Sequence, residues 1–191
     1  MIHPHTAPRR ISAEVGLGVF ATDRIPRGTI VWALDPFDLK LTPEVIAGYP
    51  PMLQAAVARG AYPADDGRWV FCWDHGRHVN HSCRPNCVDI GGSFQLALRT
   101  IEPGDELTCD YAACGHFTEF MCGCGAPDCR GWIPLQSERA TPEPETLAEL
   151  FAVAGTLDQP LLAFAAPEPA EAWVLELFGA KASFGRVGGQ R

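Results

Sequence analysis

Residues 80–87 read Asn-His-Ser-Cys-Arg-Pro-Asn-Cys, and this stretch constrains the fold more than any other. An amide, an imidazole and a thiol are adjacent, and a proline then restricts the backbone. Folding so many polar groups into one loop is unfavourable unless they bind something. Two related blocks follow, Glu-Leu-Thr-Cys-Asp-Tyr at residues 106–111 and Cys-Gly-Cys-Gly-Ala-Pro-Asp-Cys-Arg-Gly at residues 122–131. The three blocks together indicate a ligand-binding chain, with a metal among its ligands.

The eight cysteines are better explained by metal binding or catalysis than by disulfides. The first residues are polar, with no apolar run behind them, and no segment has the roughly 18 apolar residues that a membrane span needs. We therefore expect no membrane association and a reducing cytoplasm, or a nuclear, chromatin-associated location if the source is eukaryotic.

A structural zinc site is expected because three cysteines lie within eight residues, between glycines that allow tight turns. These three are Cys122, Cys124 and Cys129. Zinc in a closed structural site takes four ligands, so a fourth must come from elsewhere in the chain. The candidates are Cys83 and Cys87, followed by Cys114 and Cys109. A distant fourth ligand would tie this loop to residues 80–87, and metal binding would then build the pocket between them.

Composition limits the class of partner. The 191 residues suffice for about one domain, and a hydrophobic fraction of 47% allows a true core. The net charge of −8 argues against direct nucleic-acid binding and suits a basic protein or peptide. We expect a monomer or a weak dimer.

The pattern of residues predicts a mainly β fold with a small helical insert and a partly helical C-terminal tail. Alternating or β-rich runs predict strands at residues 15–21, 29–32, 69–73 and 94–99. Thr42 followed by Pro43 predicts a helix start, and residues 52–58 predict a second short helix. Beyond a Pro-rich linker, apolar stripes predict helices at residues 147–153 and 171–178.

In order along the chain, four blocks resemble the signature segments of SET-domain protein-lysine N-methyltransferases with a post-SET zinc motif. They are Gly-Leu-Gly at residues 16–18, Arg-His-Val-Asn-His-Ser-Cys-Arg-Pro-Asn at 77–86, the block at 106–111 and the cysteine block at 122–131. The resemblance implies a SET β-clip fold in which residues around Asn80 and Tyr111 form a pseudoknot. It implies a SET domain at 9–113 with an insert at about 38–68, a post-SET segment at 114–136 and an extension at 137–191.

The resemblance also implies roles for residues. S-adenosylmethionine would be the methyl donor, Tyr111 would hold the catalytic position, and one zinc ion would take Cys83 with the three clustered cysteines. The residues expected at the cofactor are Gly16, Leu17, Gly18, Arg77, His78, Asn80, His81 and Tyr111. Trp132, directly after the zinc loop, could stack on adenine or pack on that loop.

Three features depart from the family pattern. Cys109 stands two residues before Tyr111, where the family has Phe or Tyr, so we expect a roomier substrate channel and di- or trimethylation. His78 replaces a common aromatic residue. The chain lacks a cysteine-rich pre-SET region and has a short insert, so the substrate preference of histone enzymes cannot be inherited.

The leading function is transfer of methyl groups to lysine in a protein substrate. The alternatives are a catalytically silent SET-fold binding module and a plain zinc-binding interaction domain. We expect solvent or loop positions, without metal ligation, for His3, His5, His75 and His116. Cys72 is expected as a small buried hydrophobe and Cys114 as a bystander near the zinc loop.

Overall fold

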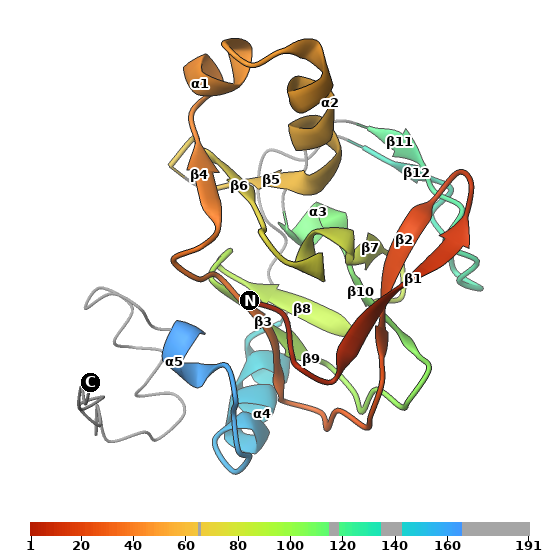
Figure 1. The fold of residues 1–191 in the computed structure, drawn as a ribbon. Helices are drawn as coiled ribbons and strands as arrows, with labels where there is room; N and C mark the ends of the chain where they lie inside the picture. The colour runs from red at the N-terminus through yellow and green to blue at the C-terminus, as the bar shows by residue number, and fades with distance from the viewer. Residues whose placement is uncertain (65, 115–118, 135–142, 166–191) are drawn as a thin grey trace, which may run out of the picture.

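The computed structural model describes residues 1–64, 66–114, 119–134 and 143–165. Within these ranges the chain forms small β-sheets with short helices around them (Figure 1), as the sequence predicts. The strands are β1 (Thr6–Ser12), β2 (Gly16–Ala21), β3 (Ile30–Ala33), β4 (Leu39–Leu41), β5 (Ala61–Pro63), β6 (Trp69–Phe71), β7 (Asn80–His81), β8 (Cys87–Ile90), β9 (Phe94–Ala97), β10 (Glu106–Cys109), β11 (Phe120–Met121) and β12 (Trp132–Ile133). The helices are α1 (Pro43–Ala47), α2 (Pro51–Gly60), the 3₁₀ helix η1 (His75–His78), α3 (Tyr111–Cys114), α4 (Pro144–Ala154) and α5 (Leu162–Ala165).

The largest sheet has the strand order β1-β2-β10-β7 and brings two distant sequence blocks together. β1 and β2 form an antiparallel hairpin, and Gly16 begins β2 with a φ of 85°, a conformation that glycine adopts without strain. β10 then pairs antiparallel with β2 and parallel with β7. In the parallel pair Thr108 lies opposite Asn80, and Cys109 lies opposite His81. The two blocks for which the resemblance implies a pseudoknot therefore lie side by side in one sheet.

Asn86 fastens the two blocks together. It is buried, and its Nδ2 donates to the carbonyl oxygen of Glu106 at 2.8 Å while its Oδ1 accepts from the backbone N–H of Thr108 at 2.8 Å. The backbone N–H of Ser82 also donates to the carbonyl of Cys109 at 3.0 Å. A buried amide with both ends bonded gives a defined register, because any shift would leave polar groups unpaired.

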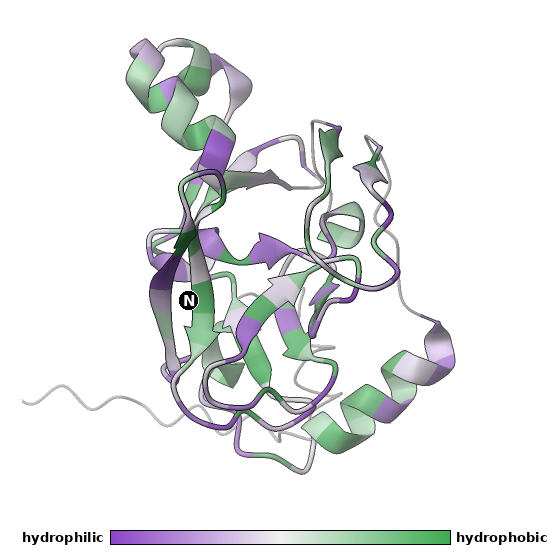
Figure 2. Cartoon of the chain, turned by 90° about the vertical axis from the view of Figure 1, so that its right-hand side faces the viewer, coloured by the Kyte–Doolittle hydropathy of each residue, from purple (hydrophilic) through white to green (hydrophobic). Residues whose placement is uncertain are grey.

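The insert between β3 and η1 forms a separate small sheet, β4-β6-β5, with α1 and α2 above it at the top of Figure 1. Thr42 caps α1 by accepting a hydrogen bond from the backbone N–H of Val45, and Pro43 occupies the first turn, as predicted. α2 covers the second helix predicted at residues 52–58. Figure 2 shows mixed polar and apolar colouring along these helices, and only Val57 of α2 is buried among their residues.

The C-terminal helices pack on the core through the sheet β3-β9-β8. Leu150 and Ala154 of α4 are buried with Ile30 and Phe94. Gln159 adds polar contacts, because its Oε1 accepts from the N–H of Ile30 at 2.8 Å and its Nε2 donates to the carbonyls of Gly28 and Ala154. The helix predicted at 147–153 lies within α4, whereas the one predicted at 171–178 falls outside the described residues.

No helix in the described part of the chain is both long and apolar enough to cross a membrane. The predicted strands correspond to β2, β3, β6 and β9 with shifts of one or two residues at their ends. The short strands β11 and β12, which pair Met121 with Trp132, are not predicted from the sequence.

Candidate active site and cysteine cluster

Tyr111 begins α3, directly after the end of β10, and its side chain is anchored at both ends. Its hydroxyl donates to the carbonyl oxygen of Val79 at 3.0 Å, and its backbone N–H donates to His81 Nδ1 at 3.2 Å. The His81 ring lies 5.5 Å from the Tyr111 ring, and the Phe120 ring lies 6.0 Å from it. Burial, followed by the neighbouring Cys109, raises the pKa of the Tyr111 hydroxyl well above its usual range, so the group stays a proton donor.

Asn80 connects the glycine block to β10. Its Nδ2 donates to the carbonyl oxygen of Leu17 at 3.0 Å and to Glu106 Oε1 at 2.8 Å. A Cβ atom at Gly18 would lie 2.5 Å from Glu106 Oε1 and 3.1 Å from Asn80 Nδ2, so a larger residue there would displace the ends of these side chains. Asn80, Leu17 and Gly18, which were predicted as one group, are therefore in contact.

Arg77 and His78 lie in η1, which precedes β7. Arg77 Nη1 donates to the backbone carbonyls of Cys72, Trp73 and Asp74, the last at 2.6 Å, and the guanidinium lies over the Phe71 ring. Burial, followed by the nearby charge of Arg77, lowers the pKa of the His78 imidazole. Arg77 therefore holds the turn before Asn80.

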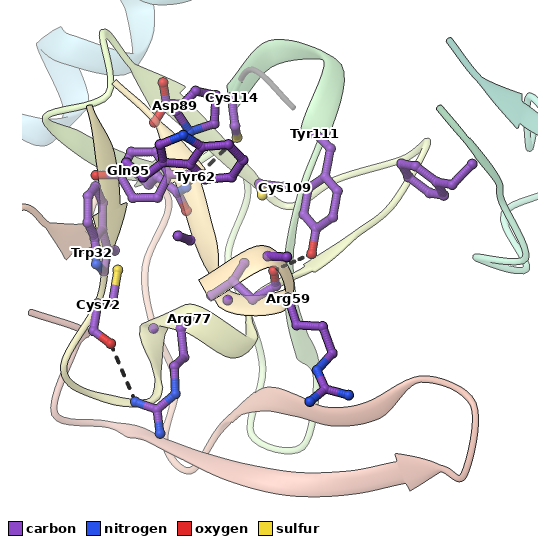
Figure 3. A pocket seen from close by; sticks show the side chains of 18 residues that line it. Trp32, Arg59, Tyr62, Cys72, Arg77, Asp89, Gln95, Cys109, Tyr111 and Cys114 are labelled. Atoms are coloured by element: carbon purple, nitrogen blue, oxygen red, sulfur yellow. Dashed lines mark hydrogen bonds between the residues drawn. The ribbon is translucent and has the colours of Figure 1, made fainter. Parts of the chain in front are cut away.

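A cavity of about 330 Å³ opens between the insert and the end of β10 (Figure 3). Its lining is mostly apolar and aromatic, which is typical of ligand pockets. The lining comprises Trp32, Ala58, Arg59, Gly60, Ala61, Tyr62, Pro63, Trp69, Cys72, Gly76, Arg77, Val79, Asp89, Gln95, Cys109, Tyr111, Cys114 and Phe120. Of the predicted site residues, Cys109, Tyr111 and Arg77 meet here.

The two ends of this cavity differ in charge. Arg59 and Arg77 lie at one end in the view of Figure 3, and Asp89, Gln95 and Cys114 lie at the other. Asp89 and Gln95 are cross-strand partners in β8 and β9, so they share one face of the sheet. Gln95 Oε1 is buried with no hydrogen-bond partner among the described residues. Cys114, predicted as a bystander, instead belongs to this wall.

The four cysteines predicted as metal ligands lie together. The sulfur atoms of Cys83, Cys122, Cys124 and Cys129 are all within 4.8 Å of one another, and the Cys83 and Cys122 sulfurs are 3.8 Å apart. Burial opposes ionisation of the Cys124 thiol, but the N–H groups of Cys83 and Ala126 outweigh it and lower its pKa to about 6. Burial raises the pKa of the neighbouring Cys122 thiol to about 12, so of these two groups Cys124 is the one that readily gives the thiolate, the form that binds metals.

Cys87 is excluded from this cluster. It is buried in β8, and its Sγ donates to Asn86 Oδ1 instead. Burial raises the pKa of its thiol to about 12. The alternation along β8 turns Cys87 toward the core, whereas Cys83 lies in the loop after β7. Of the candidates for the fourth ligand that the sequence left open, Cys83 and Cys87 first and Cys114 and Cys109 after them, Cys83 is the one that joins the cluster.

The remaining predicted residues lie at the periphery. Trp132 is 45% exposed in β12, opposite Met121, which is 74% exposed. Among the histidines predicted at solvent or loop positions, His5 is exposed, and His3 is buried but lies in a loop before β1. His75 belongs to η1 and is hydrogen-bonded to the Thr6 hydroxyl at 2.9 Å. His116 lies outside the described residues, and Cys72 is buried, as predicted.

Sequence reasoning missed several residues that shape the site. Asp110 accepts a hydrogen bond from Arg130 Nη2 at 2.6 Å, and Glu106 holds Asn80. Both acids lie inside the block at 106–111, so their position beside Tyr111 was the available signal. Gln95 and Phe120 carried no comparable signal, because their position in the cavity lining depends on strand register.

The comparisons with known proteins agree with this arrangement. A family model described as the SET domain matches residues 16–112. Histone-lysine N-methyltransferase ash1 of Drosophila melanogaster is 40% identical over 86 residues, which are 38% of this chain and 4% of that protein. An H3 lysine-36 specific histone-lysine N-methyltransferase of Gibberella zeae is 36% identical over 92 residues, 43% of this chain and 10% of that protein.

Histone-lysine N-methyltransferase ASHR3 of Arabidopsis thaliana is 39% identical over 71 residues, 34% of this chain and 14% of that protein. The chain therefore spans only a small part of these curated relatives. The family model, by contrast, covers half of this chain, and its match includes the Gly16 turn, Asn80, Cys109 and Tyr111. The chain belongs to the SET-domain family.

Proposed function

We propose that the protein transfers methyl groups from S-adenosylmethionine to the side-chain amine of lysine in a protein substrate. The observation that carries this proposal is the placement of Tyr111. Its hydroxyl is buried, protonated and fixed on the Val79 carbonyl, on the wall of an apolar cavity that an alkylamine can enter. The histone-lysine methyltransferase names of the relatives support the same activity.

The cavity suits an amine that must be neutral to react. Free lysine has a pKa near 10.4, so its ammonium form has to lose a proton first. The mostly apolar walls disfavour the charged form. The Tyr111 hydroxyl, which donates to Val79, retains lone pairs that can accept an N–H of the amine and so orient its nitrogen.

The residues around Gly18 fit the cofactor. Gly16 has open space beside its Cα and so allows close backbone approach, Asn80 supplies a fixed amide, and the exposed Trp132 offers an aromatic face. S-adenosylmethionine supplies an electrophilic methyl group on a sulfonium. We assign its binding to Gly16, Leu17, Gly18, Arg77, His78, Asn80, His81, Tyr111 and Trp132.

The cysteine cluster fits one structural zinc ion. Four sulfur ligands at about 2.3 Å in a tetrahedron would be about 3.8 Å apart. The sulfurs of Cys83 and Cys122 show this separation, and all four lie within a slightly larger limit. We assign the zinc ion to Cys83, Cys122, Cys124 and Cys129, with a structural role because the protein fills all four positions.

The substrate is a lysine-bearing basic protein, and histones are the first candidates. The net charge of −8 favours a basic partner, and the relatives carry histone-lysine methyltransferase names. A chromatin-associated location would follow for a eukaryotic source.

The test is methyl transfer from labelled S-adenosylmethionine to a panel of histones and lysate proteins. We expect labelled bands with the wild-type chain and none with Tyr111→Phe. Calorimetric binding of the cofactor by both proteins would show that the mutation removed chemistry and left binding intact. Cofactor binding without labelling of any panel protein would contradict the proposed activity and favour a silent SET-fold module.

A further inference from the structure

Cys83 accepts three hydrogen bonds beyond its contacts within the cysteine cluster. The backbone N–H of Arg130 donates to its Sγ at 3.3 Å, and the Arg130 Nε donates to it at 3.4 Å. His81 Nε2 lies 3.4 Å from the same sulfur. Two side chains therefore converge on one ligand of the proposed metal.

Both of these side chains also reach the segment that carries Tyr111. Arg130 Nη2 donates to Asp110 Oδ1 at 2.6 Å, and Asp110 directly precedes Tyr111. The ring of His81 accepts a hydrogen bond at Nδ1 from the backbone N–H of Tyr111 at 3.2 Å. The cluster sulfur and the Tyr111 backbone are thus joined by two short routes, one through the side chains of Arg130 and Asp110 and the other through His81.

The hydrogen bonds select one form of His81. A ring nitrogen that accepts the Tyr111 N–H has a free lone pair and carries no proton. The proton of the neutral ring is then on Nε2, where it is donated to Cys83 Sγ. The same tautomer satisfies both contacts, so its orientation is set by both ends together.

Asp110 needs a cation beside it in this arrangement. Its Oδ1 lies 3.5 Å from His81 Nδ1, where two lone pairs would face each other. Arg130 supplies the opposing charge at 2.6 Å, and the N–H of Ala112 donates to the same oxygen at 3.0 Å. Without the guanidinium, only the Ala112 N–H would hold the carboxylate against this repulsion, and the start of α3 would be held less firmly.

We propose that Arg130 is a positioning residue for Tyr111. Its Nη2 donates to Asp110 and its Nε donates to the Cys83 sulfur. The cysteine cluster is therefore the rigid support that fixes the position of the Tyr111 backbone. His81 completes the link through the Tyr111 backbone. The role deepens the proposed function, on which its catalytic consequence rests.

The test compares Arg130→Met, which keeps the aliphatic stem, with Arg130→Lys and with Arg84→Met. Arg84 is a matched control, since it neighbours Cys83 and pairs with Asp128 at 3.8 Å at the surface. Hydrogen exchange of the Tyr111 amide is measured on the full, zinc-loaded chain. We expect exchange roughly 10-fold faster in Arg130→Met, partial rescue in Arg130→Lys and no change in Arg84→Met.

The second readout is the cobalt-substituted protein, whose thiolate-to-metal absorption reports the hydrogen bonds to Cys83. We expect a shifted band and metal affinity about 10–100-fold weaker for Arg130→Met, with Arg84→Met matching wild type. Asp110→Asn should speed Tyr111 exchange without moving the cobalt band, because it removes only the far end of the link. This variant keeps the test decisive if Arg130→Met retains too little metal to fold.

The third readout is kinetic. In Arg130→Met we expect kcat to fall about 10–100-fold with the peptide KM unchanged. The reason is that the substrate cavity stays intact and only the orientation of the Tyr111 side chain is disturbed. Unchanged Tyr111 exchange in both Arg130→Met and Asp110→Asn would overturn the inference. Neither exchange nor cobalt absorption needs turnover, so failure of this link is distinguishable from failure of the methyltransferase proposal.

Discussion

The hydroxyl of Tyr111 donates its proton to the carbonyl oxygen of Val79 at a distance of 3.0 Å. Val79 directly precedes Asn80, so this bond joins the proposed catalytic side chain to the block that contacts the glycine segment. One hydroxyl therefore has two tasks, as it fixes the backbone before β7 and presents its lone pairs to the cavity.

Replacing Tyr111 by Phe separates these tasks. We expect methyl transfer to fall by about 100-fold or more, because the amine loses the group that orients it. The free energy of unfolding should fall by only about 1 kcal/mol, the net contribution of one such hydrogen bond. Single-turnover kinetics and denaturant unfolding of the same preparation check both. A loss of several kcal/mol would show that the residue is chiefly structural.

We expect the small side chain of Cys109 to leave extra room beside Tyr111. It is buried in β10 and lines the cavity at a position where the family has a larger aromatic residue. We expect wild-type protein to yield di- or trimethyllysine and Cys109→Tyr to stop at monomethyllysine, because the ring fills the space for added methyl groups. Mass spectra of one peptide with both proteins decide this. Strictly one methyl group from the wild type on a good substrate would contradict it.

Residue chemistry made much of the site predictable. Zinc requires four ligands, so three clustered cysteines demanded a fourth, and Cys83 was one of two leading candidates. The choice between Cys83 and Cys87 needed the structure, because it depends on which face of β8 the chain presents. Thr42 and Pro43 predicted the start of α1 for a local reason, the capping of free N–H groups.

Long-range contacts were not predictable from spacing. Gln95 and Asp89 share the cavity wall because β8 and β9 pair in one particular register, which no local pattern specifies. The contact of Arg130 with Asp110 likewise spans 20 residues and arises only when the cysteine loop folds back. The packing of α4 on the core depends on tertiary burial of Leu150, for which helical periodicity indicates only an apolar face.

The cysteine cluster predicts a difference between two single substitutions. Cys83→Ala should bind zinc substoichiometrically and melt at a lower temperature, because metal binding free energy is part of folding free energy here. Cys87→Ala should keep one zinc ion per chain, since its sulfur lies outside the cluster. Elemental analysis and thermal melting with and without chelator check this. Full zinc content in Cys83→Ala would show that another residue serves as fourth ligand.

α4 should stabilise the fold without taking part in chemistry. Leu150 is fully buried against the sheet β3-β9-β8, so Leu150→Ala removes a large side chain from a packed core. We expect the free energy of unfolding to fall by about 2–5 kcal/mol, with methyl transfer by the remaining folded protein unchanged. Thr146→Ala, an exposed position on the same helix, is the control and should change stability by less than about 0.5 kcal/mol. Equal stability of the two variants would show that α4 is not part of the core.

Acid should destabilise the protein through buried histidine. His3 is 6% exposed, and its Nδ1 accepts the backbone N–H of His5 at 3.2 Å, a contact that requires an unprotonated nitrogen. Burial, followed by the charge of His5, lowers the pKa of His3 to about 4, and burial also lowers the pKa values of His75 and His78. An unfolded histidine titrates near 6.5.

Between about pH 6.5 and 4, His3 is therefore protonated in the unfolded chain but unprotonated in the folded chain. Its contribution to the free energy of unfolding is fully present above pH 6.5 and is lost as the pH is lowered toward 4. The loss from this residue amounts to as much as about 3 kcal/mol at the lower end. Denaturant unfolding at half-unit pH steps measures how the free energy of unfolding changes with pH. His3→Gln, whose side chain stays neutral, should reduce this pH dependence and leave only the contributions of His75 and His78. Parallel curves for the two proteins across this window would mean that His3 becomes protonated in the folded state without cost, and that its burial does not keep it neutral.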